Sequence, residues 1–244
     1  NYLLVGRYTD DANVGPYVPL FAAAGEPAQL DQTEAKFQLS FKGRVWTTDD
    51  RRWGVWLAYT QQNQWQVYND NISRPFRETN YMPEAIVSYR PGVDLGGGFK
   101  SNLLNASFNH QSHGRTDALS RSWNRVYFGA GFERNEFGVQ WRVHRRVDES
   151  RSDDDNPDLT NYIGRGEVIA TWLPGLATAG LTWRTNLRAL NRGSLQLDLT
   201  YPVDSDEPAG LRWYMQVFSG YGETLLDYNH RQTTIGLGLS LFQF

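Results

Sequence analysis

Three polar residues near the middle of the chain are of the types that carry out nucleophilic hydrolysis: His110, Ser112 and Asn124. A serine hydroxyl is a poor nucleophile until a neighbouring base takes its proton, and His110 lies two residues before Ser112. The side-chain carbonyl of Asn124 can accept a hydrogen bond from the imidazole Nδ1 and hold it in one tautomer. A His-x-Ser pair alone is more often structural than catalytic. The position of these residues in the fold must therefore decide between the two roles.

Alternation of apolar and polar residues predicts the elements that carry these side chains. Every second residue is apolar, with Gly, Gln, Arg and other polar residues between, in the stretches 37–41, 137–143, 195–199 and 235–241. A period of two with one apolar and one polar face indicates β-strands. No segment shows a convincing helical period. The sequence therefore predicts an all-β fold.

The connections between the expected strands alternate in length. Short ones fall near 47–51, 91–96, 133–136, 174–176 and 203–209; long ones fall near 10–34, 69–80, 112–121, 147–160 and 221–232, and 190–192 is short on the long side. Short periplasmic turns and longer extracellular loops are typical of outer-membrane barrels, which in bacteria have an even number of strands. We count eleven clear strands after residue 34, and Tyr2–Tyr8 supplies a twelfth. We predict one domain over 1–244, a transmembrane antiparallel β-barrel of about twelve strands with both termini periplasmic.

Composition limits the alternatives. The chain has 244 residues, a net charge of −3 and no cysteine, which argues against a nucleic-acid partner, a disulfide framework and a thiolate metal site. No run of eighteen apolar residues is present, so a membrane helix is excluded. The rival fold is a soluble β-barrel or sandwich whose apolar face forms a core. It is disfavoured because Gly, Gln and Arg recur on one face of the strands while Trp and Tyr cluster at strand ends, as interface girdles do.

The alternation also places the candidate catalytic residues on the outer surface. His110 and Ser112 continue the apolar face that holds Leu104 and Phe108, because side chains repeat every second residue along a strand. Asn124 continues the corresponding face of the returning strand. All three residues should therefore lie near the outer edge of the lipid-facing surface, which lipids reach and water-soluble substrates do not.

Several sequence blocks accompany these three residues along the chain. They are Gly114, Arg115 and Asp117, SRSWNR at 120–125, PFRETNY at 75–81, DDNPD at 154–158 and SGYGE at 219–223. Their identity and order resemble the outer-membrane phospholipases A over nearly the whole chain. The resemblance implies a twelve-stranded barrel in the bacterial outer membrane with calcium-dependent phospholipase A1/A2 activity on phospholipids and lysophospholipids. It also implies that Ser112 is the nucleophile, His110 the general base and Asn124 the orienting residue.

A calcium site is expected beside the nucleophile. The loop 114–121 offers the Asp117 carboxylate, the Ser120 hydroxyl and the Arg115 carbonyl, which are the hard oxygen ligands that Ca²⁺ takes. The resemblance adds Asp155 from the next long loop. The ion and the Gly114 amide would stabilise the oxyanion that a neutral asparagine leaves undercompensated. The alternative is that Asp117 only shapes a turn.

Dimerisation is the expected form of regulation, since a lipase facing the bilayer would otherwise hydrolyse its own membrane continuously. Gln61 shares a face with Leu57 and Tyr59, and a polar amide facing lipid is costly unless it is paired. The Gln61 side chain of a second copy is a suitable mate, and the resemblance points the same way. Ser73 would then offer its carbonyl to the partner's calcium. The alternative places Gln61 in the headgroup zone, where an amide costs little.

The remaining polar residues receive structural interpretations. We expect a hydrogen-bond network inside the barrel from Arg125, Arg142, Arg184, Glu84 and Glu167, and a solvated loop from the acidic run 148–158. His113 lies beside the nucleophile on the opposite strand face and is interpreted as a rim residue rather than a second base. The competing functional class is a non-enzymatic porin or structural barrel, which would place its functional polar groups in the lumen.

Overall fold

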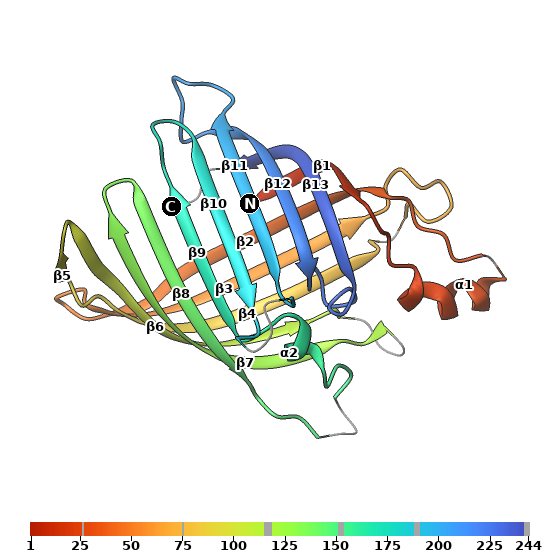
Figure 1. Cartoon of the computed structure of the whole chain (residues 1–244), viewed down its shortest axis with the longest axis horizontal. Helices are drawn as coiled ribbons and strands as arrows, with labels where there is room; N and C mark the ends of the chain where they lie inside the picture. Colours follow the sequence, from red (N-terminus) through yellow and green to blue (C-terminus); the bar gives the residue numbers. More distant parts are fainter. Residues whose placement is uncertain (26, 75, 115–118, 151–153, 188–190, 242–244) are drawn as a thin grey trace.

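The alternating stretches form long antiparallel strands that close into a barrel (Figure 1). The computed structural model describes residues 1–25, 27–74, 76–114, 119–150, 154–187 and 191–241. The twelve long strands are β1 (Tyr2–Thr9), β2 (Thr33–Thr47), β3 (Trp53–Trp65), β4 (Glu78–Tyr89), β6 (Phe99–Ser112), β7 (Ser122–Arg134), β8 (Phe137–Arg146), β9 (Gly166–Trp172), β10 (Thr178–Thr185), β11 (Ser194–Pro202), β12 (Leu211–Tyr221) and β13 (Arg231–Leu241). The pairing of β1 with β13 and of β4 with β6 closes the sheet, so the predicted twelve-stranded barrel is confirmed.

One further short strand, β5 (Val93–Gly96), lies where the sequence predicted only a turn. It pairs with the first residues of β6 and so extends the β4–β6 hairpin at its tip. Gly96, Gly97 and Gly98 follow in succession, all with positive φ, a conformation that glycine adopts without steric cost. The hairpin is therefore longer than its turn residues suggested, but the number of strands around the barrel does not change.

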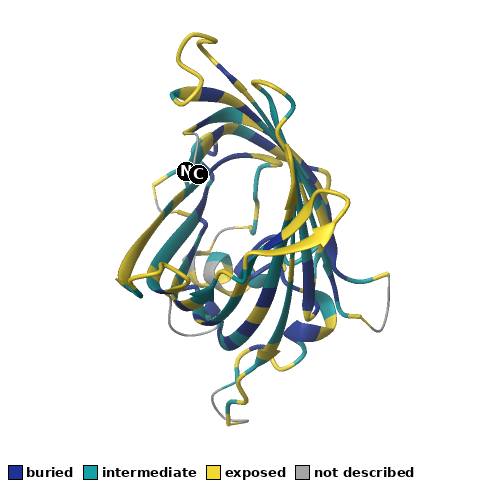
Figure 2. Ribbon diagram, turned by 90° about the vertical axis from the view of Figure 1, so that its left-hand side faces the viewer, coloured by how far each residue is buried: buried dark blue, intermediate teal, exposed yellow. Residues whose placement is uncertain are grey.

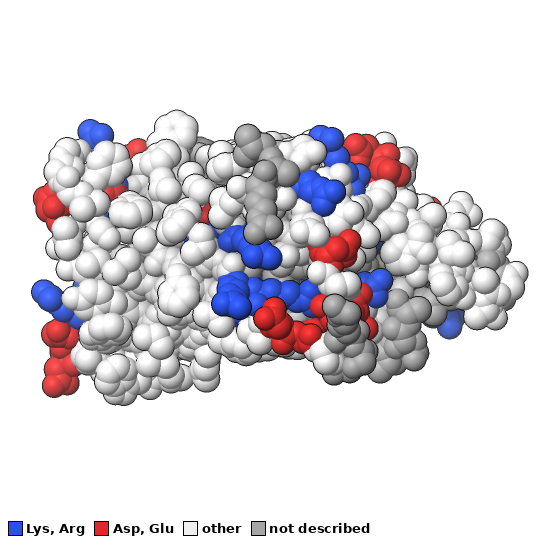
Figure 3. Space-filling view, turned by 60° about the horizontal axis from the view of Figure 1, so that its bottom comes forward, with Lys and Arg blue, Asp and Glu red and all other residues white. Residues whose placement is uncertain are grey.

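The distribution of side chains is the reverse of that in a soluble protein. Large apolar residues are exposed on the outside of the strands, including Phe41 at 68%, Trp213 at 60% and Leu237 at 60%. Buried residues line the inside of the sheet (Figure 2), and many of them are charged or amide residues. Figure 3 shows a broad belt of the outer surface without Lys, Arg, Asp or Glu, between charged side chains on either side. This pattern is that of a wall that faces lipid.

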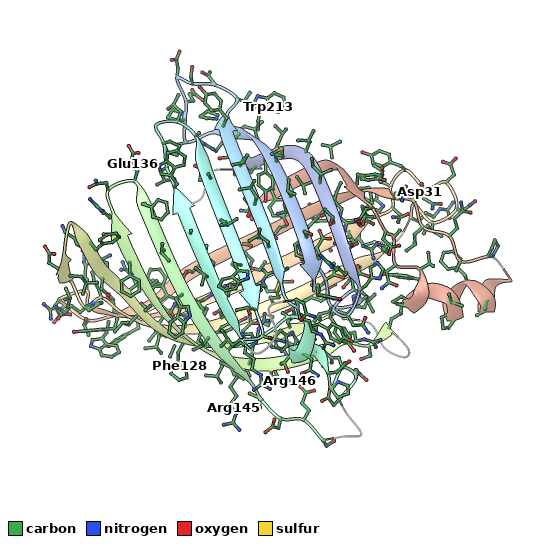
Figure 4. The ribbon with its side chains drawn as sticks, in the orientation of Figure 1. Asp31, Phe128, Glu136, Arg145, Arg146 and Trp213 are labelled. Carbon is green, nitrogen blue, oxygen red and sulfur yellow. The ribbon has the colours of Figure 1, made fainter. Side chains whose placement is uncertain are left out.

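The two ends of the barrel differ as the loop lengths predicted. Glu136, in the short turn after β7, and Asp31, in the long loop before β2, lie at opposite ends (Figure 4). The backbone N–H of Leu241 donates to the carbonyl of Asn1, so the first and last described residues meet at the end that carries the short turns. The described parts of the long loops, including residues 113–114 and 119–121 between β6 and β7, lie at the other end (Figure 1).

The expectation of no helical segment was wrong for the long loops. A 3₁₀ turn, η1 (Gly15–Tyr17), leads into α1 (Val18–Ala24), and α2 (Leu159–Tyr162) forms a single turn. Segments this short complete at most two turns, so no periodic pattern can develop in the sequence. Pro19 fits the start of α1, where its missing N–H would have no partner in any case. No helix in the described part of the chain is long and apolar enough to cross a membrane.

The long loops pack over the barrel mouth and form small apolar clusters there. Trp123, at the start of β7, packs with Leu159, Leu225 and Tyr228. A second cluster joins Tyr17 to Leu119 and Leu226. These are among the few large apolar side chains that the fold buries, so the loop end has a core of its own. That core fixes the start of β7, from which Asn124 projects.

Inside the barrel, the expected polar network is present. Glu167 binds both Arg142 and Arg184, with a distance of 2.9 Å from the Arg184 Nε. Arg125 Nε donates to Asn109 at 2.9 Å, and Glu84 lines the same polar cavity of about 300 Å³. Buried charges persist only when they are paired and hydrogen-bonded. These contacts join residues on neighbouring strands, β6 with β7 and β9 with β8 and β10, so the charged groups are paired along the inner wall beside the cavity.

A second ionic cluster fastens the last long loop to the barrel wall, and it makes a testable stability prediction. Glu223 binds Arg7 and also accepts a hydrogen bond from Lys36 Nζ at 2.9 Å, and all three side chains are buried. Burial would raise the pKa of Glu223, but the charges of Arg7 and Lys36 outweigh it and lower the pKa from 4.5 to about 2. The stabilisation is therefore complete above about pH 4.5 and is lost as the pH falls towards 2.

We expect Glu223→Gln to lower the free energy of unfolding at pH 7 by roughly 3–5 kcal/mol, because Arg7 and Lys36 lose a buried counter-charge. Thermal unfolding in detergent micelles measures this, and the difference from wild type should shrink as the pH falls from 4 to 2. The control is Glu207→Gln, which changes an exposed residue in a short turn. An unfolding temperature of Glu223→Gln equal to that of wild type at pH 7 would contradict the prediction.

Candidate active site

Strands β6 and β7 bring His110 and Asn124 face to face. The two residues are directly paired across the strands, and the His110 Nδ1 lies 2.9 Å from the Asn124 Oδ1. Since the amide oxygen can only accept, this hydrogen bond places the proton on Nδ1 and leaves Nε2 free to act as a base. The predicted orienting contact therefore exists in the structure.

The same strands turn these side chains to the outside by anchoring their neighbours inside. Gln111, between His110 and Ser112, accepts hydrogen bonds from Trp123 Nε1 at 3.1 Å and from Arg125 Nη2 at 3.0 Å. Trp123 is fully buried. Because strand side chains alternate, fixing Gln111 and Trp123 inside directs their neighbours outward. The interior network thus sets the orientation of the exterior site.

Ser112 is the last residue of β6, and it is half-buried between two neighbouring strands. It pairs with Ser122 of β7 on one side and Tyr81 of β4 on the other. The hydrogen bonds of the described residues do not include one between the Ser112 hydroxyl and His110. Such catalytic hydrogen bonds are often long without substrate and tighten only when it binds. The structure therefore places Ser112 and His110 on one strand face, two residues apart.

Gly114 follows the nucleophile in a conformation that only glycine tolerates here. Its φ is +70°, and a Cβ at this position would lie 2.4 Å from the Tyr81 Cε2. Both the backbone angle and the neighbouring ring exclude a side chain. The chain consequently turns sharply away from β6 just after Ser112. The predicted oxyanion role of the Gly114 amide stays a prediction.

Two of the four predicted calcium ligands within this chain come together in the structure. The Ser120 hydroxyl donates to the Asp155 Oδ2 at 2.6 Å, across two long loops. Arg115 and Asp117 lie outside the described residues. Within the described ranges, no three His, Cys, Asp or Glu side chains gather as a metal site would require. Ser120 and Asp155 supply hydroxyl and carboxylate oxygens, which suit Ca²⁺, so this part of the donor set fits the ion.

The predicted dimer residues have partners within their own chain. Gln61 Oε1 accepts a hydrogen bond from the Tyr59 hydroxyl at 3.0 Å, and Gln61 Nε2 donates to the Asn63 Oδ1 at 3.2 Å. The amide therefore does not need a second barrel to satisfy it, which weakens the physical argument for a Gln61 pair. The Ser73 carbonyl accepts from Trp65 Nε1 at 2.6 Å and keeps one lone pair available.

His113 lies on the opposite strand face from Ser112, as expected, but it is buried rather than at an exposed rim. Its side chain is 2% exposed, and its Nδ1 lies 3.9 Å from the Glu78 Oε1 inside the barrel. Its backbone N–H donates to the Arg121 carbonyl at 2.9 Å and closes the base of the loop. A second base at Ser112 is therefore not supplied by His113.

Glu149 is a residue at the site that the sequence did not single out. The Asn124 Nδ2 donates to the Glu149 Oε1 at 3.0 Å. The acidic run 148–158 was interpreted as a solvated loop, and for this residue that interpretation was wrong. The only signal in the sequence was that Glu149 follows β8, the strand next to β7. Loop residues beyond the end of a strand have no periodic pattern, so the direction of the side chain could not be predicted.

Charged side chains of both signs surround the loop that follows β8 and contains Glu149. Arg145 points away from the barrel (Figure 4) and lies 4.0 Å from the exposed Asp148. Arg146 instead donates to the Asn156 carbonyl at 2.7 Å and to the Asp154 Oδ1 at 2.6 Å. On the face in Figure 3, basic and acidic side chains gather in one such mixed group. Arg146 holds the loop against the barrel beside Asn124.

Comparisons with known sequences point to one family. The sequence profile of the family described as phospholipase A1 matches residues 1–241 of the chain. A relative from Neisseria meningitidis serogroup B is 35% identical over 252 residues, which cover 98% of this chain and 63% of that protein. The chain thus spans slightly less than two thirds of the length of this relative.

Two solved structures of outer membrane phospholipases have the same fold as this chain, and their sequence identity to it is close to that of the relative above. The outer membrane phospholipase A from Escherichia coli superposes with a TM-score of 0.87 at 32% identity, covering 100% of this chain and 92% of that one. A Salmonella typhi outer membrane phospholipase, described as a dimer with bound calcium, also gives 0.87 at 32% identity, with 100% and 90% covered. Because the superpositions cover the whole chain, the similarity extends over the entire barrel and is not confined to one motif.

Proposed function

Because the chain belongs to the phospholipase A1 family, we propose that it hydrolyses acyl ester bonds of phospholipids and lysophospholipids in the bacterial outer membrane, with Ser112 as nucleophile. The observation that carries this proposal is the His110–Asn124 hydrogen bond on the outer face of the barrel, next to Ser112. A site on that face, near the long-loop end, is open to lipid molecules from the side. With the short-turn end and both termini in the periplasm, it lies at the outer leaflet.

The reaction follows from the roles of the three side chains. The Ser112 hydroxyl attacks the ester carbonyl while His110 Nε2 takes its proton, and Asn124 holds the resulting imidazolium through Nδ1. The tetrahedral intermediate then expels the lysolipid alkoxide, which receives the proton from His110. Water next attacks the acyl-serine ester, again giving its proton to His110, and the fatty acid leaves as Ser112 recovers its proton. No residue inside the lumen takes part.

The alternative of a porin or structural barrel finds little support in the interior. Inside the lumen, Arg125 donates to Asn109 on the neighbouring strand, and Glu167 binds Arg142 and Arg184 on the strands on either side, so these polar groups are paired with one another along the wall. The test of the proposed function is fatty-acid release from phospholipid in mixed micelles by the wild-type protein, compared with its Ser112→Ala variant. If neither protein releases fatty acid, a non-enzymatic barrel becomes the better interpretation.

Calcium is the cofactor that we propose for this reaction. Ser120 and Asp155 would hold it, together with Asp117 and the Arg115 carbonyl, and the ion would supply positive charge for the oxyanion beside the Gly114 amide. The support is the contact between Ser120 and Asp155 near Ser112, and a related protein that is described as having bound calcium. The donor chemistry and the loop positions agree with this assignment.

We also propose that the enzyme acts as a homodimer, in which the Ser73 carbonyl of one barrel completes the calcium site of the other. A flat barrel face cannot enclose acyl chains, whereas two adjoining barrels form a groove between them. The Salmonella typhi relative described as a dimer supports this arrangement. Gln61 lies on the outward face of β3, and its Nε2 retains a second hydrogen for a partner.

The dimer proposal makes a measurable prediction for Gln61→Leu. If Gln61 pairs across the interface, the variant should require more calcium than wild type, both for activity and for the monomer–dimer transition in detergent. We expect the required calcium concentration to rise only about 2- to 5-fold. Gln61 already has intrachain partners in Tyr59 and Asn63, and a polar contact between segments within a membrane is worth roughly 0.6–1 kcal/mol. Sedimentation and activity on the same samples measure both. A wild type that is fully active as a monomer would refute the dimer.

A further inference from the structure

The amide of Asn124 is held at both ends, and only one end belongs to the proposed catalytic triad. Its oxygen lies 2.9 Å from His110 Nδ1, and its nitrogen donates to the Glu149 Oε1 at 3.0 Å. An ionised carboxylate only accepts hydrogen bonds. Reversing the amide would place its oxygen against the Glu149 carboxylate and its NH₂ group against His110 Nδ1. Glu149 therefore excludes the reversed orientation.

We propose that Glu149 is a positioning residue that acts on His110 through Asn124, an inference that rests on the proposed hydrolase function. Asparagine can orient an imidazole but carries no charge, so alone it stabilises an imidazolium less than aspartate does. The Glu149 carboxylate supplies negative charge one hydrogen bond further away. Hydrogen bonds in series polarise one another, which strengthens the contact between Asn124 and His110. Asn124 and Glu149 together provide the orientation and the charge that one aspartate would provide.

The backbone brings Glu149 to this place by extending the β7–β8 pairing. The N–H of Val147 donates to the Asn124 carbonyl at 2.8 Å, one step beyond the last residue of β8. Glu149 follows two residues later, where the chain has left the ladder and the side chain can turn back towards Asn124. The side chain is 17% exposed, so the carboxylate is largely shielded from water and its contact with Asn124 is weakly screened.

Arg146 holds the Glu149 carboxylate in position. Its Nη2 lies 3.4 Å from the Glu149 Oε2 and 2.6 Å from the Asp154 Oδ1. One guanidinium thus holds both carboxylates, and the Glu149 Oε1 remains the oxygen that accepts from Asn124. The same loop also delivers Asp155 to Ser120. A single loop therefore supplies the carboxylate that contacts Asn124 and another carboxylate to the proposed calcium site.

The test compares Glu149→Ala and Glu149→Gln with wild type in steady-state hydrolysis of phospholipid in mixed micelles. We expect Glu149→Ala to lower kcat roughly 10- to 100-fold with KM little changed, the range for an outer residue that orients a catalytic ligand. Glu149→Gln keeps an acceptor oxygen but loses the charge, so its kcat should lie between those of wild type and Glu149→Ala. The matched control is Asp148→Ala, which removes the neighbouring, exposed carboxylate and should keep the wild-type kcat.

A double-mutant cycle separates positioning from a general structural role. If Glu149 acts through Asn124, then Glu149→Ala should cause no further loss of kcat in the Asn124→Ala background. The inference is overturned if Glu149→Ala keeps the wild-type kcat, or if its loss is equally large in both backgrounds. Wild-type hydrolysis that Ser112→Ala abolishes would leave the proposed function standing in either case. A wild type without hydrolysis would overturn both.

Discussion

Replacing Ser112 by alanine should abolish fatty-acid release while leaving the barrel folded. The variant removes only a hydroxyl at the end of β6, and backbone pairing with β4 and β7 does not depend on it. Surface substitutions of this kind change the free energy of unfolding by at most about 0.5 kcal/mol. Loss of the nucleophile in a serine hydrolase costs roughly 10⁴- to 10⁶-fold in kcat. Fatty-acid release in mixed micelles and the thermal unfolding of the same samples measure the two effects.

The chain offers a close control for this experiment in Ser122, which is paired with Ser112 across the strands. Ser122→Ala makes the same chemical change on the adjoining strand and should keep most of the activity. His110→Ala should be nearly as damaging as Ser112→Ala, because nucleophile and base act as a unit. Asn124→Ala should leave measurable turnover, since the base remains while its orientation is lost. Substantial turnover by Ser112→Ala would end the assignment of the nucleophile.

The orientation of His110, Ser112 and Asn124 was predictable because a strand has only two faces. Once Phe108 is assigned to lipid, His110 and Ser112 must follow it, and the directly paired Asn124 lies on the same side. The same logic places Gln111 and Arg125 inside, where the structure finds them hydrogen-bonded to each other. The barrel is thus specified by a pattern that any single strand shows weakly but that twelve strands repeat.

Contacts made by the loops were not predictable in the same way. Glu149 reaches Asn124 only because the chain leaves the ladder after Val147 and turns back, and no residue pattern encodes that path. The short segments η1 and α1 are held by tertiary contacts, since Tyr17 of η1 meets Leu119 and Leu226 from other loops and Phe21 of α1 packs against this cluster. Loop positions depend on partners distant in the sequence, and a single sequence does not reveal them.

The intrachain partners of Gln61 illustrate another limit. The cost of an amide in lipid predicts that the side chain will find a partner, but not which one. The structure satisfies it with Tyr59 and Asn63, two residues away on either side along the same strand face. The physical requirement was identified correctly, and the pairing of Gln61 with a second barrel stays a prediction. The homodimer consequently depends on the calcium site and on the related dimer.

Removal of calcium should abolish activity as completely as loss of the nucleophile, and calcium should restore it. In the proposed site the ion would supply positive charge that stabilises the developing oxyanion. EGTA should therefore reduce fatty-acid release to background, and excess Ca²⁺ should return it fully. Mg²⁺ should restore little, because it demands a smaller octahedral site and gives up its waters reluctantly. Activity measured across buffered concentrations of each ion tests this.

Ser120→Ala is the variant that assigns this calcium dependence to the loop site. The Ser120 hydroxyl contacts Asp155 at 2.6 Å, so its removal takes away one ligand oxygen and the partner of another. A loss of about 1.4 kcal/mol, close to the lower limit for a hydrogen bond to a charged group, corresponds to a tenfold higher calcium concentration for half-maximal activity. The maximal rate at saturating calcium should change much less, since Ser112 and His110 are intact. Asp148→Asn alters an exposed carboxylate on the same loop as Asp155 and should follow the wild-type calcium curve. Activity that survives EGTA, or a Ser120→Ala curve that coincides with wild type, would show that this site does not hold the ion.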